Sequence, residues 1–200
     1  MIDQKLINDN SVYLSNALKN SVTISPQIKF LTNVFDQPVL VKLQEYFANQ
    51  YHSNLWQFET TEYGEIMSNV PRYKISWDPE SVVEEIHEVC NSVTPVVEEM
   101  CQGKTAFHGI ALWRDHSGYN IGWHTDNPIL KITMQIYLDG LESCPGTEFK
   151  TDSGTIVAPF VKNTGYFLNQ GELRPMHRLA HTVPHNQTRY SLFAMWKNIS

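Results

Sequence analysis

Hydrophobic positions in the first half of the chain recur at helical spacing. Asp36 is a suitable N-cap, Pro38 falls in the first turn, and apolar residues follow one face to about Asn49. This pattern predicts a helix over residues 36–49. Residues 1–25 carry only weak patterns with many Asn and Ser, so we expect an ordered edge or a partly loose arm there.

A second apolar stripe runs from Val82 to Met100. The segment Asp78-Pro79-Glu80 before it has the composition of a helix start. Pro95 lies inside the stripe and is expected to kink or divide the helix, which Gly103 should end. The stripe therefore predicts a helix that packs against a sheet.

After Gly103 the hydrophobic period changes from helical to two, which indicates strands. Strands are predicted at 106–113, 119–124, 129–138, 147–149, 154–157, 165–168, 179–183 and 189–196, with a turn at 115–118. Residues 28–31, before the first predicted helix, are predicted to form a short strand. Residues 51–77, between the two predicted helices, are predicted to be loop and short strand. Many short strands favour a sandwich or barrel, and helices that precede them favour packing on one face. We expect a mainly β fold with supporting helices.

Composition and length place limits on the class of protein. The 200 residues suit a single domain, with 1–103 as support and 104–200 as the β core. Hydrophobic content of 42% and charged content of 18% indicate a globular chain, and the net charge of -6 argues against non-specific nucleic-acid binding. Three cysteines suggest free thiols in a reducing cytoplasm. We expect no signal peptide and no membrane span.

The candidate chemistry lies in Gly122-Trp123-His124-Thr125-Asp126. Residues i and i+2 of a strand project to the same side, so His124 and Asp126 can direct an imidazole and a carboxylate at one point. With a distant histidine they would form the two-histidine, one-carboxylate site of non-haem Fe(II) oxygenases. Arg189 could hold a carboxylate nearby in its fork.

Several motifs resemble the 2-oxoglutarate/Fe(II)-dependent dioxygenase superfamily, nearest its prolyl-hydroxylase-like branch. They occur in the family's order in the C-terminal half: 118–126, Tyr137-Leu138-Asp139-Gly140, Pro145-Gly146-Thr147-Glu148-Phe149, and 181–192. The resemblance implies a double-stranded β-helix, the cupin-like jelly roll. The chain departs from the family in its single Gly146 before Thr147, in Ile121 where a tyrosine is common, and in a short spacing from His181 to Arg189.

The resemblance also implies roles for individual residues. His124, Asp126 and His181 would bind Fe(II), Arg189 would bind the distal carboxylate of 2-oxoglutarate, and O2 would be the co-substrate. His177 competes with His181 as the third ligand; we favour His181 because Val183-Pro184 and Arg189 follow it in the family's register.

Further candidates have structural alternatives. Tyr119 and Gln135 are candidates for cofactor contact, with core packing or cross-strand pairing as the alternative. Arg72, Lys74, Trp113 and Arg114 could face substrate, but a solvated surface is the favoured interpretation for any one of them.

The expected function is hydroxylation of an unknown substrate. A protein or peptide side chain of the prolyl type comes first, a free amino acid or other small molecule next, and nucleic acid is unlikely. The retained Asp126 favours hydroxylation, because halogenating relatives have a small residue there. Two rivals remain: a non-enzymatic β-sandwich binding module, and a cupin-like metal protein without 2-oxoglutarate. Arg189 distinguishes them, since neither rival needs it.

Overall fold

The computed structural model describes residues 2–58, 72–171 and 174–199. Its helices are α1 (Gln4–Lys19), α2 (Gln37–Asn49), α3 (Val82–Ser92) and α4 (Thr94–Cys101). Its strands are β1 (Val22–Ser25), β2 (Ile28–Thr32), β3 (Gln57–Phe58), β4 (Arg72–Ile75), β5 (Thr105–His116), β6 (Leu130–Asp139), β7 (Thr147–Thr151), β8 (Gly154–Ala158), β9 (Thr164–Asn169), β10 (His177–Leu179) and β11 (Thr188–Asn198).

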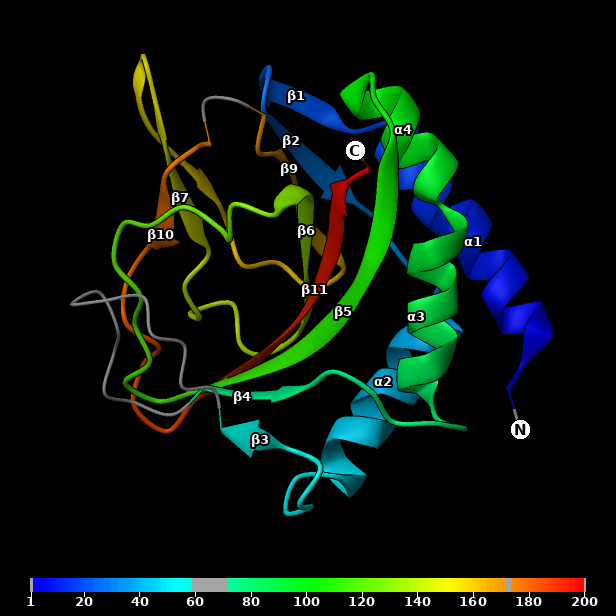
Figure 1. Cartoon of the computed structure of the whole chain (residues 1–200). Coiled ribbons are helices and arrows are strands. Elements are labelled where there is room, and N and C mark those ends of the chain that lie inside the picture. Colours follow the sequence, from blue (N-terminus) through cyan, green and yellow to red (C-terminus); the bar gives the residue numbers. More distant parts are fainter. Residues whose placement is uncertain (1, 59–71, 172–173, 200) are drawn as a thin grey trace.

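The strands form two antiparallel sheets. The large sheet has the order β1-β2-β9-β6-β11-β5-β4-β3, and the small sheet has the order β10-β7-β8. A bridge between His124 and His177 extends the small sheet by one further segment. The prediction of a mainly β fold with supporting helices is confirmed, and the two sheets are arranged as expected for a jelly roll (Figure 1).

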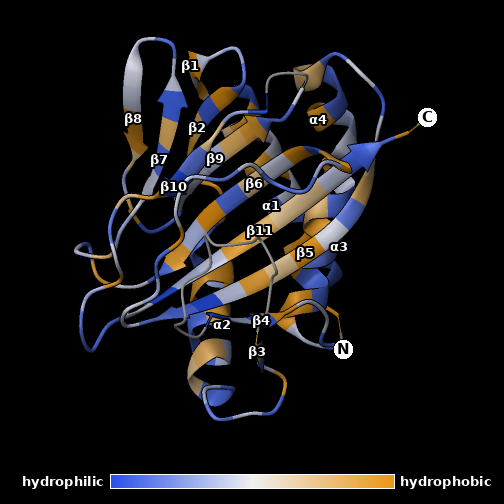
Figure 2. Ribbon diagram, turned by 60° about the vertical axis from the view of Figure 1, so that its left-hand side comes forward, coloured by the Kyte–Doolittle hydropathy of each residue, from blue (hydrophilic) through white to orange (hydrophobic). Residues whose placement is uncertain are grey.

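The central strands carry both hydrophobic and hydrophilic residues (Figure 2). Successive side chains of a strand point to opposite faces of the sheet, so alternation decides which of them face the helices. On β11, Leu192, Ala194 and Trp196 belong to the main hydrophobic core, whereas Phe193 and Met195 line a pocket on the opposite face. The side chains of β5 and β6 also alternate between the hydrophobic core and the pocket face. The helices α1, α3 and α4 lie on one side of the large sheet and the small sheet lies on the other (Figure 1).

Local sequence signals explain most helix boundaries. Asp36 caps α2 by accepting a hydrogen bond from the backbone nitrogen of Val39 at 3.0 Å, as expected. The second helix is divided as predicted, because α3 ends at Ser92 and α4 begins just before Pro95. Its start differs, since Ser81 rather than Asp78 is the N-cap and accepts from Val83.

Two sequence expectations need correction. Residues 4–19 form the regular helix α1, where an edge or a loose arm was expected. The predicted strands at 119–124 and 179–183 are not regular: the first contributes an isolated bridge, and the second is displaced to β10 at His177–Leu179. Part of the predicted loop region 51–77, residues 59–71, lies outside the described residues. Because β10 begins at His177, this residue and not His181 lies opposite His124.

Close backbone approach explains one glycine of the sheet. Gly165 on β9 faces Ile136 on β6, and a Cβ atom at this glycine would lie 2.0 Å from the carbonyl oxygen of Gln135. Only glycine permits this separation.

Cys90, Cys101 and Cys144 are all free thiols. Within the described ranges, every helix is too short or too polar to cross a lipid bilayer.

Candidate metal centre

Three potential metal ligands meet between the two sheets. One ligand atom from each of His124, Asp126 and His177 lies within 4.8 Å of the others. The Nε2 atom of His177 is 3.4 Å from Oδ1 of Asp126, and the two imidazole ring centroids are 4.3 Å apart. The backbones of the two histidines exchange a pair of hydrogen bonds, each 2.9 Å long. Adjacent segments of the small sheet therefore place both imidazoles beside one carboxylate.

Backbone carbonyl groups orient both imidazoles. The Nδ1 atom of His124 lies 2.8 Å from the Gly122 oxygen, and that of His177 lies 3.3 Å from the Pro175 oxygen. A carbonyl oxygen can only accept, so each Nδ1 must carry the proton. In the neutral rings the lone pairs then reside on Nε2, which is the arrangement that a metal-ligating histidine needs.

The electrostatics of the three groups are coupled. Burial, together with the neighbouring His177, lowers the pKa of His124 to about 4. Burial also opposes charge on His177, but attraction to Asp126 outweighs it and raises the pKa of His177. The same attraction holds the pKa of Asp126 below its ordinary value despite burial. A neutral His124 and an ionised Asp126 are the protonation states that bind cations.

The third candidate metal ligand in the structure is not the histidine that was favoured from sequence. His181 is exposed, and its Nδ1 donates to the carbonyl oxygen of Thr182 at 3.0 Å. It lies four residues beyond His177, after the end of β10. His177, the alternative considered from sequence, lies beside His124 and Asp126 instead of His181. The short spacing from His181 to Arg189 is the sequence feature that agrees with this placement.

A buried ionic network lies at the end of β5 and the start of β11. Arg189 is 1% exposed, and Asp115 is fully buried. The Nε of Arg189 donates to Oδ2 of Asp115 at 2.7 Å, and its Nη1 donates to the Pro145 oxygen at 2.6 Å. Arg72 on β4 donates to the same carboxylate through Nε at 2.5 Å and Nη2 at 3.0 Å. One carboxylate thus holds two guanidinium groups.

Aromatic rings complete the surroundings of Arg72. Its guanidinium lies 4.4 Å from the ring centroid of Trp113 and 4.5 Å from that of Tyr119. This stacking is favourable for a planar cation, and it fixes the guanidinium against Asp115. Tyr119, for which sequence offered cofactor contact or core packing, packs with Leu179 in a small apolar cluster and against Arg72.

The three ligand candidates and Arg189 line one pocket of about 330 Å³. Its lining also includes Gln135, Thr147 and Tyr166, all of them buried. The Tyr166 hydroxyl donates to Oε1 of Gln135 at 2.6 Å. Gln135, a candidate for cofactor contact from sequence, therefore lines the same pocket as the three ligand candidates.

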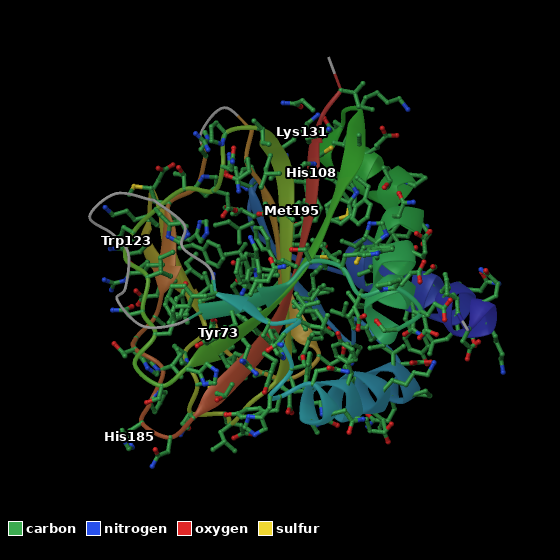
Figure 3. All side chains as sticks on the ribbon, turned by 60° about the horizontal axis from the view of Figure 1, so that its bottom comes forward. Tyr73, His108, Trp123, Lys131, His185 and Met195 are labelled. Carbon is green, nitrogen blue, oxygen red and sulfur yellow. The ribbon has the colours of Figure 1, made fainter. Side chains whose placement is uncertain are left out.

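The rest of the pocket lining is more apolar. It includes Ala111, Trp113, Ile129, Leu130, Phe193 and Met195, with Lys74, Ser76 and His108 adding polar groups. Figure 3 shows His108 and Met195 on neighbouring strands of the large sheet, and His185 far away at the turn before β11. Arg72, Lys74 and Trp113 line the pocket, although a solvated surface was favoured for them from sequence. Arg114 instead donates to the Tyr51 oxygen and lies over aromatic rings.

Comparisons with known proteins place this geometry in a wider context. No protein-family model and no curated protein matches the chain. Solved structures match over most of its length. A Pseudomonas putida prolyl-4-hydroxylase has a TM-score of 0.70 at 11% identity, over 95% of this chain and 99% of that one.

Two further structures extend the comparison. A 2OG-Fe(II) oxygenase family oxidoreductase from Burkholderia pseudomallei has a TM-score of 0.65 at 15% identity, covering 98% of this chain and 93% of that one. The chain has the fold of the 2-oxoglutarate/Fe(II) oxygenases. The α-ketoglutarate-dependent epimerase SnoN from nogalamycin biosynthesis also has this fold, with a TM-score of 0.65 at 9% identity over 94% of this chain and 82% of that one. The jelly-roll prediction is confirmed.

Several residues near the ligand candidates were missed from sequence. Thr133 and Gln170 both contact Asp126, and Asp115 links Arg189 to Arg72. None belongs to a local motif: Gln170 and Asp115 act through partners 44 and 74 positions away, and Thr133 reaches Asp126 from the next strand. Alternation on β6 was the one available signal for Thr133, since it is polar and lies between apolar positions.

Proposed function

We propose that the protein is an Fe(II)- and 2-oxoglutarate-dependent oxygenase in which His124, Asp126 and His177 bind the metal. The observation that carries the proposal is the meeting of these three ligands in one pocket with Arg189, on the fold of this enzyme class. Two imidazoles and one carboxylate suit a divalent iron that must keep open positions. The donor set therefore fits the metal.

Arg189 is proposed to hold the distal carboxylate of 2-oxoglutarate. Its hydrogen bonds to the described residues use Nε and Nη1, so among these residues Nη2 remains for a ligand. Thr147 is a second candidate, because its hydroxyl oxygen accepts from Tyr137 at 3.0 Å and its own proton can be donated. A buried arginine with a hydroxyl donor forms a strong site for a carboxylate.

The chain's contribution to the reaction is binding and orientation. Bound iron and 2-oxoglutarate, with O2, would supply the oxidising chemistry. Arg189 and the three ligands would fix the cofactor in the pocket. The apolar part of the lining, with Trp113, Phe193 and Met195, would hold the carbon to be oxidised and exclude water. Hydroxylation of a C–H bond is the proposed outcome.

Two substrate classes follow from this proposal. A prolyl-type side chain in a protein or peptide comes first, supported by the match to the Pseudomonas putida prolyl-4-hydroxylase. A free amino acid or other small molecule is the second, supported by the match to SnoN, an epimerase from nogalamycin biosynthesis. We treat residues 1–200 as one oxygenase domain, because the main hydrophobic core is shared by the helices and the large sheet.

The decisive experiment measures ligand-induced stabilisation of the native state. Thermal unfolding of metal-free protein is recorded alone, with Mn(II), with 2-oxoglutarate, and with both. A ligand that binds only the native state at a hundredfold excess over Kd stabilises it by about 2.7 kcal/mol. We expect stabilisation by Mn(II), and a further increase with 2-oxoglutarate that requires the metal.

Matched variants assign the effect to residues. His177→Ala should abolish the Mn(II) response, whereas His181→Ala should leave it intact. Arg189→Met should retain the response to Mn(II) but lose the further response to 2-oxoglutarate. A metal response without any effect of 2-oxoglutarate would favour the cupin-like rival. No response to either ligand would favour the binding module and refute the proposal.

A further inference from the structure

The carboxylate of Asp126 uses its two oxygens differently. Oδ1 lies 3.4 Å from Nε2 of His177, on the side of the three candidate ligands. Oδ2 accepts a hydrogen bond from Oγ1 of Thr133 at 2.8 Å and another from Nε2 of Gln170 at 2.6 Å. Two buried side chains therefore hold one oxygen and leave the other directed at the histidines.

The two donors come from the rigid large sheet. Thr133 is fully buried on β6, and Gln170, 1% exposed, directly follows β9. These strands are paired, and the backbone nitrogen of Gln170 donates to the Lys131 oxygen at 2.8 Å. Asp126 itself lies in an irregular segment, where its backbone oxygen also accepts from Arg174. The sheet thus fixes a carboxylate that is carried by an irregular segment.

The amide orientation of Gln170 depends on Asp126. Its Nε2 also lies 3.3 Å from Oγ1 of Thr133, so its two hydrogens can serve the carboxylate and the hydroxyl. Its Oε1 is buried and has no hydrogen-bond partner among the described residues. Turning the amide over would place Oε1 against the carboxylate oxygen. An unpaired buried carbonyl is unfavourable, and such a group in a native structure calls for a functional explanation.

We propose that Gln170 and Thr133 are positioning residues that keep Asp126 a one-oxygen metal ligand. The inference rests on the proposed function. A carboxylate whose second oxygen already accepts two hydrogen bonds has little tendency to chelate with both oxygens. Chelation by Asp126 would occupy a metal position that the 2-oxo acid needs. Without the two donors, the carboxylate is free to rotate, and metal affinity and coordination both change.

The test uses variants that remove one donor each. Gln170→Leu and Thr133→Val delete a donor with little change in shape, and Thr133→Ser keeps the hydroxyl. Gln44→Leu is the matched control, because the Gln44 amide donates to the Asp139 carboxylate at 3.0 Å away from the pocket. Mn(II) affinity is measured from the paramagnetic resonance signal of the free ion. Coordination is followed by visible absorption of the Co(II)-loaded protein with and without 2-oxoglutarate.

We expect Gln170→Leu and Thr133→Val each to weaken Mn(II) binding by about 10- to 100-fold. Both should alter the Co(II) spectrum, while Thr133→Ser and Gln44→Leu keep the wild-type values. The double variant should lose less than the product of the two effects, because both donors act on one oxygen. If Gln170→Leu fails to fold, the nearly isosteric Thr133→Val decides alone.

Other outcomes separate the inference from the function on which it rests. Wild-type protein that binds Mn(II), with unchanged affinity and spectrum in the donor variants, would overturn the positioning role and leave the proposed function intact. Wild-type protein that binds no Mn(II) would refute both. Equal loss of affinity in Gln44→Leu would show a general effect on stability and overturn the positioning role.

Discussion

Asp115 is the residue at which a single change should have the largest electrostatic effect on stability. It is fully buried and accepts three hydrogen bonds from two guanidinium groups, those of Arg72 and Arg189. The variant Asp115→Asn keeps the size of the side chain and removes its charge. The two arginines then remain in a largely buried position without a counter-ion.

The magnitude follows from the burial of the network. The side chains of Arg189 and Arg72 are 1% and 17% exposed, so water can replace little of the lost interaction. Removing one partner of a buried ion pair costs about 3–5 kcal/mol. In a chain of this size that corresponds to a fall in Tm on the order of 10 °C. The loss is a large part of a typical domain stability of about 5–15 kcal/mol.

The assay is urea unfolding of the metal-free protein, followed by tryptophan fluorescence at neutral pH. Asp139→Asn is the matched control, because Asp139 is 36% exposed and lies 4.0 Å from Lys162. An ion pair of this kind contributes at most about 1 kcal/mol. If Asp115→Asn were no more destabilised than Asp139→Asn, the argument from the buried network would be refuted.

The pH dependence provides a second check. Burial alone would raise the pKa of Asp115, but Arg72 and Arg189 outweigh it and hold the pKa below its usual value. A depressed folded-state pKa stabilises the protein above the unfolded pKa of about 3.9, and this stability is lost as pH falls through the folded value. The difference in unfolding free energy between wild type and Asp115→Asn should therefore be constant near neutral pH and should decrease only in acid.

Two further predictions concern packing. Gly165→Ala places a Cβ 2.0 Å from the Gln135 oxygen, so we expect severe destabilisation and disturbance of the pocket in a urea titration; normal stability would contradict the close approach of the strands. Phe47→Ala removes a ring stacked 4.3 Å from that of Tyr190 and should cost about 3–5 kcal/mol, whereas a loss below about 1 kcal/mol would show that the site collapses without a cavity.

Local sequence patterns determined the elements whose signals lie within a few residues. The Asp36 cap and the first-turn proline predicted α2, and Pro95 predicted the division between α3 and α4. The predicted start of α3 at Asp78 was wrong. Asp78 and Ser81 are both suitable N-cap residues close together in sequence, and only the conformation of the backbone shows that Ser81 is the cap. Asp78 instead accepts a hydrogen bond from Tyr46 at 2.7 Å.

The helix α1 shows where local signals are insufficient. It is stabilised by burial of Leu6, Leu14 and Leu18, and Asn10 is buried within it as well. Its many Asn and Ser residues have weak helix propensity, so its sequence alone does not favour a helix. Tertiary packing against α3 supplies the missing stability.

The residues of the candidate site likewise fall into those that local sequence could predict and those that it could not. His124 and Asp126 could be recognised from sequence because their ligand atoms come from one short segment, as could Arg189 from its place before an apolar strand. The choice between His177 and His181 could not, because it depends on which residue lies opposite His124 across the small sheet. Register between distant segments is set by the packing of both sheets, which no local pattern contains.

The partners of the site residues were likewise decided by tertiary structure alone. Gln170 reaches Asp126 across 44 positions, and Arg189 reaches Asp115 across 74. The sequence by itself determined the chemical groups available and the periodicity that forms the sheets. Only the folded chain determined which of those groups meet, because burial makes an unpaired polar or charged side chain costly and so selects specific partners.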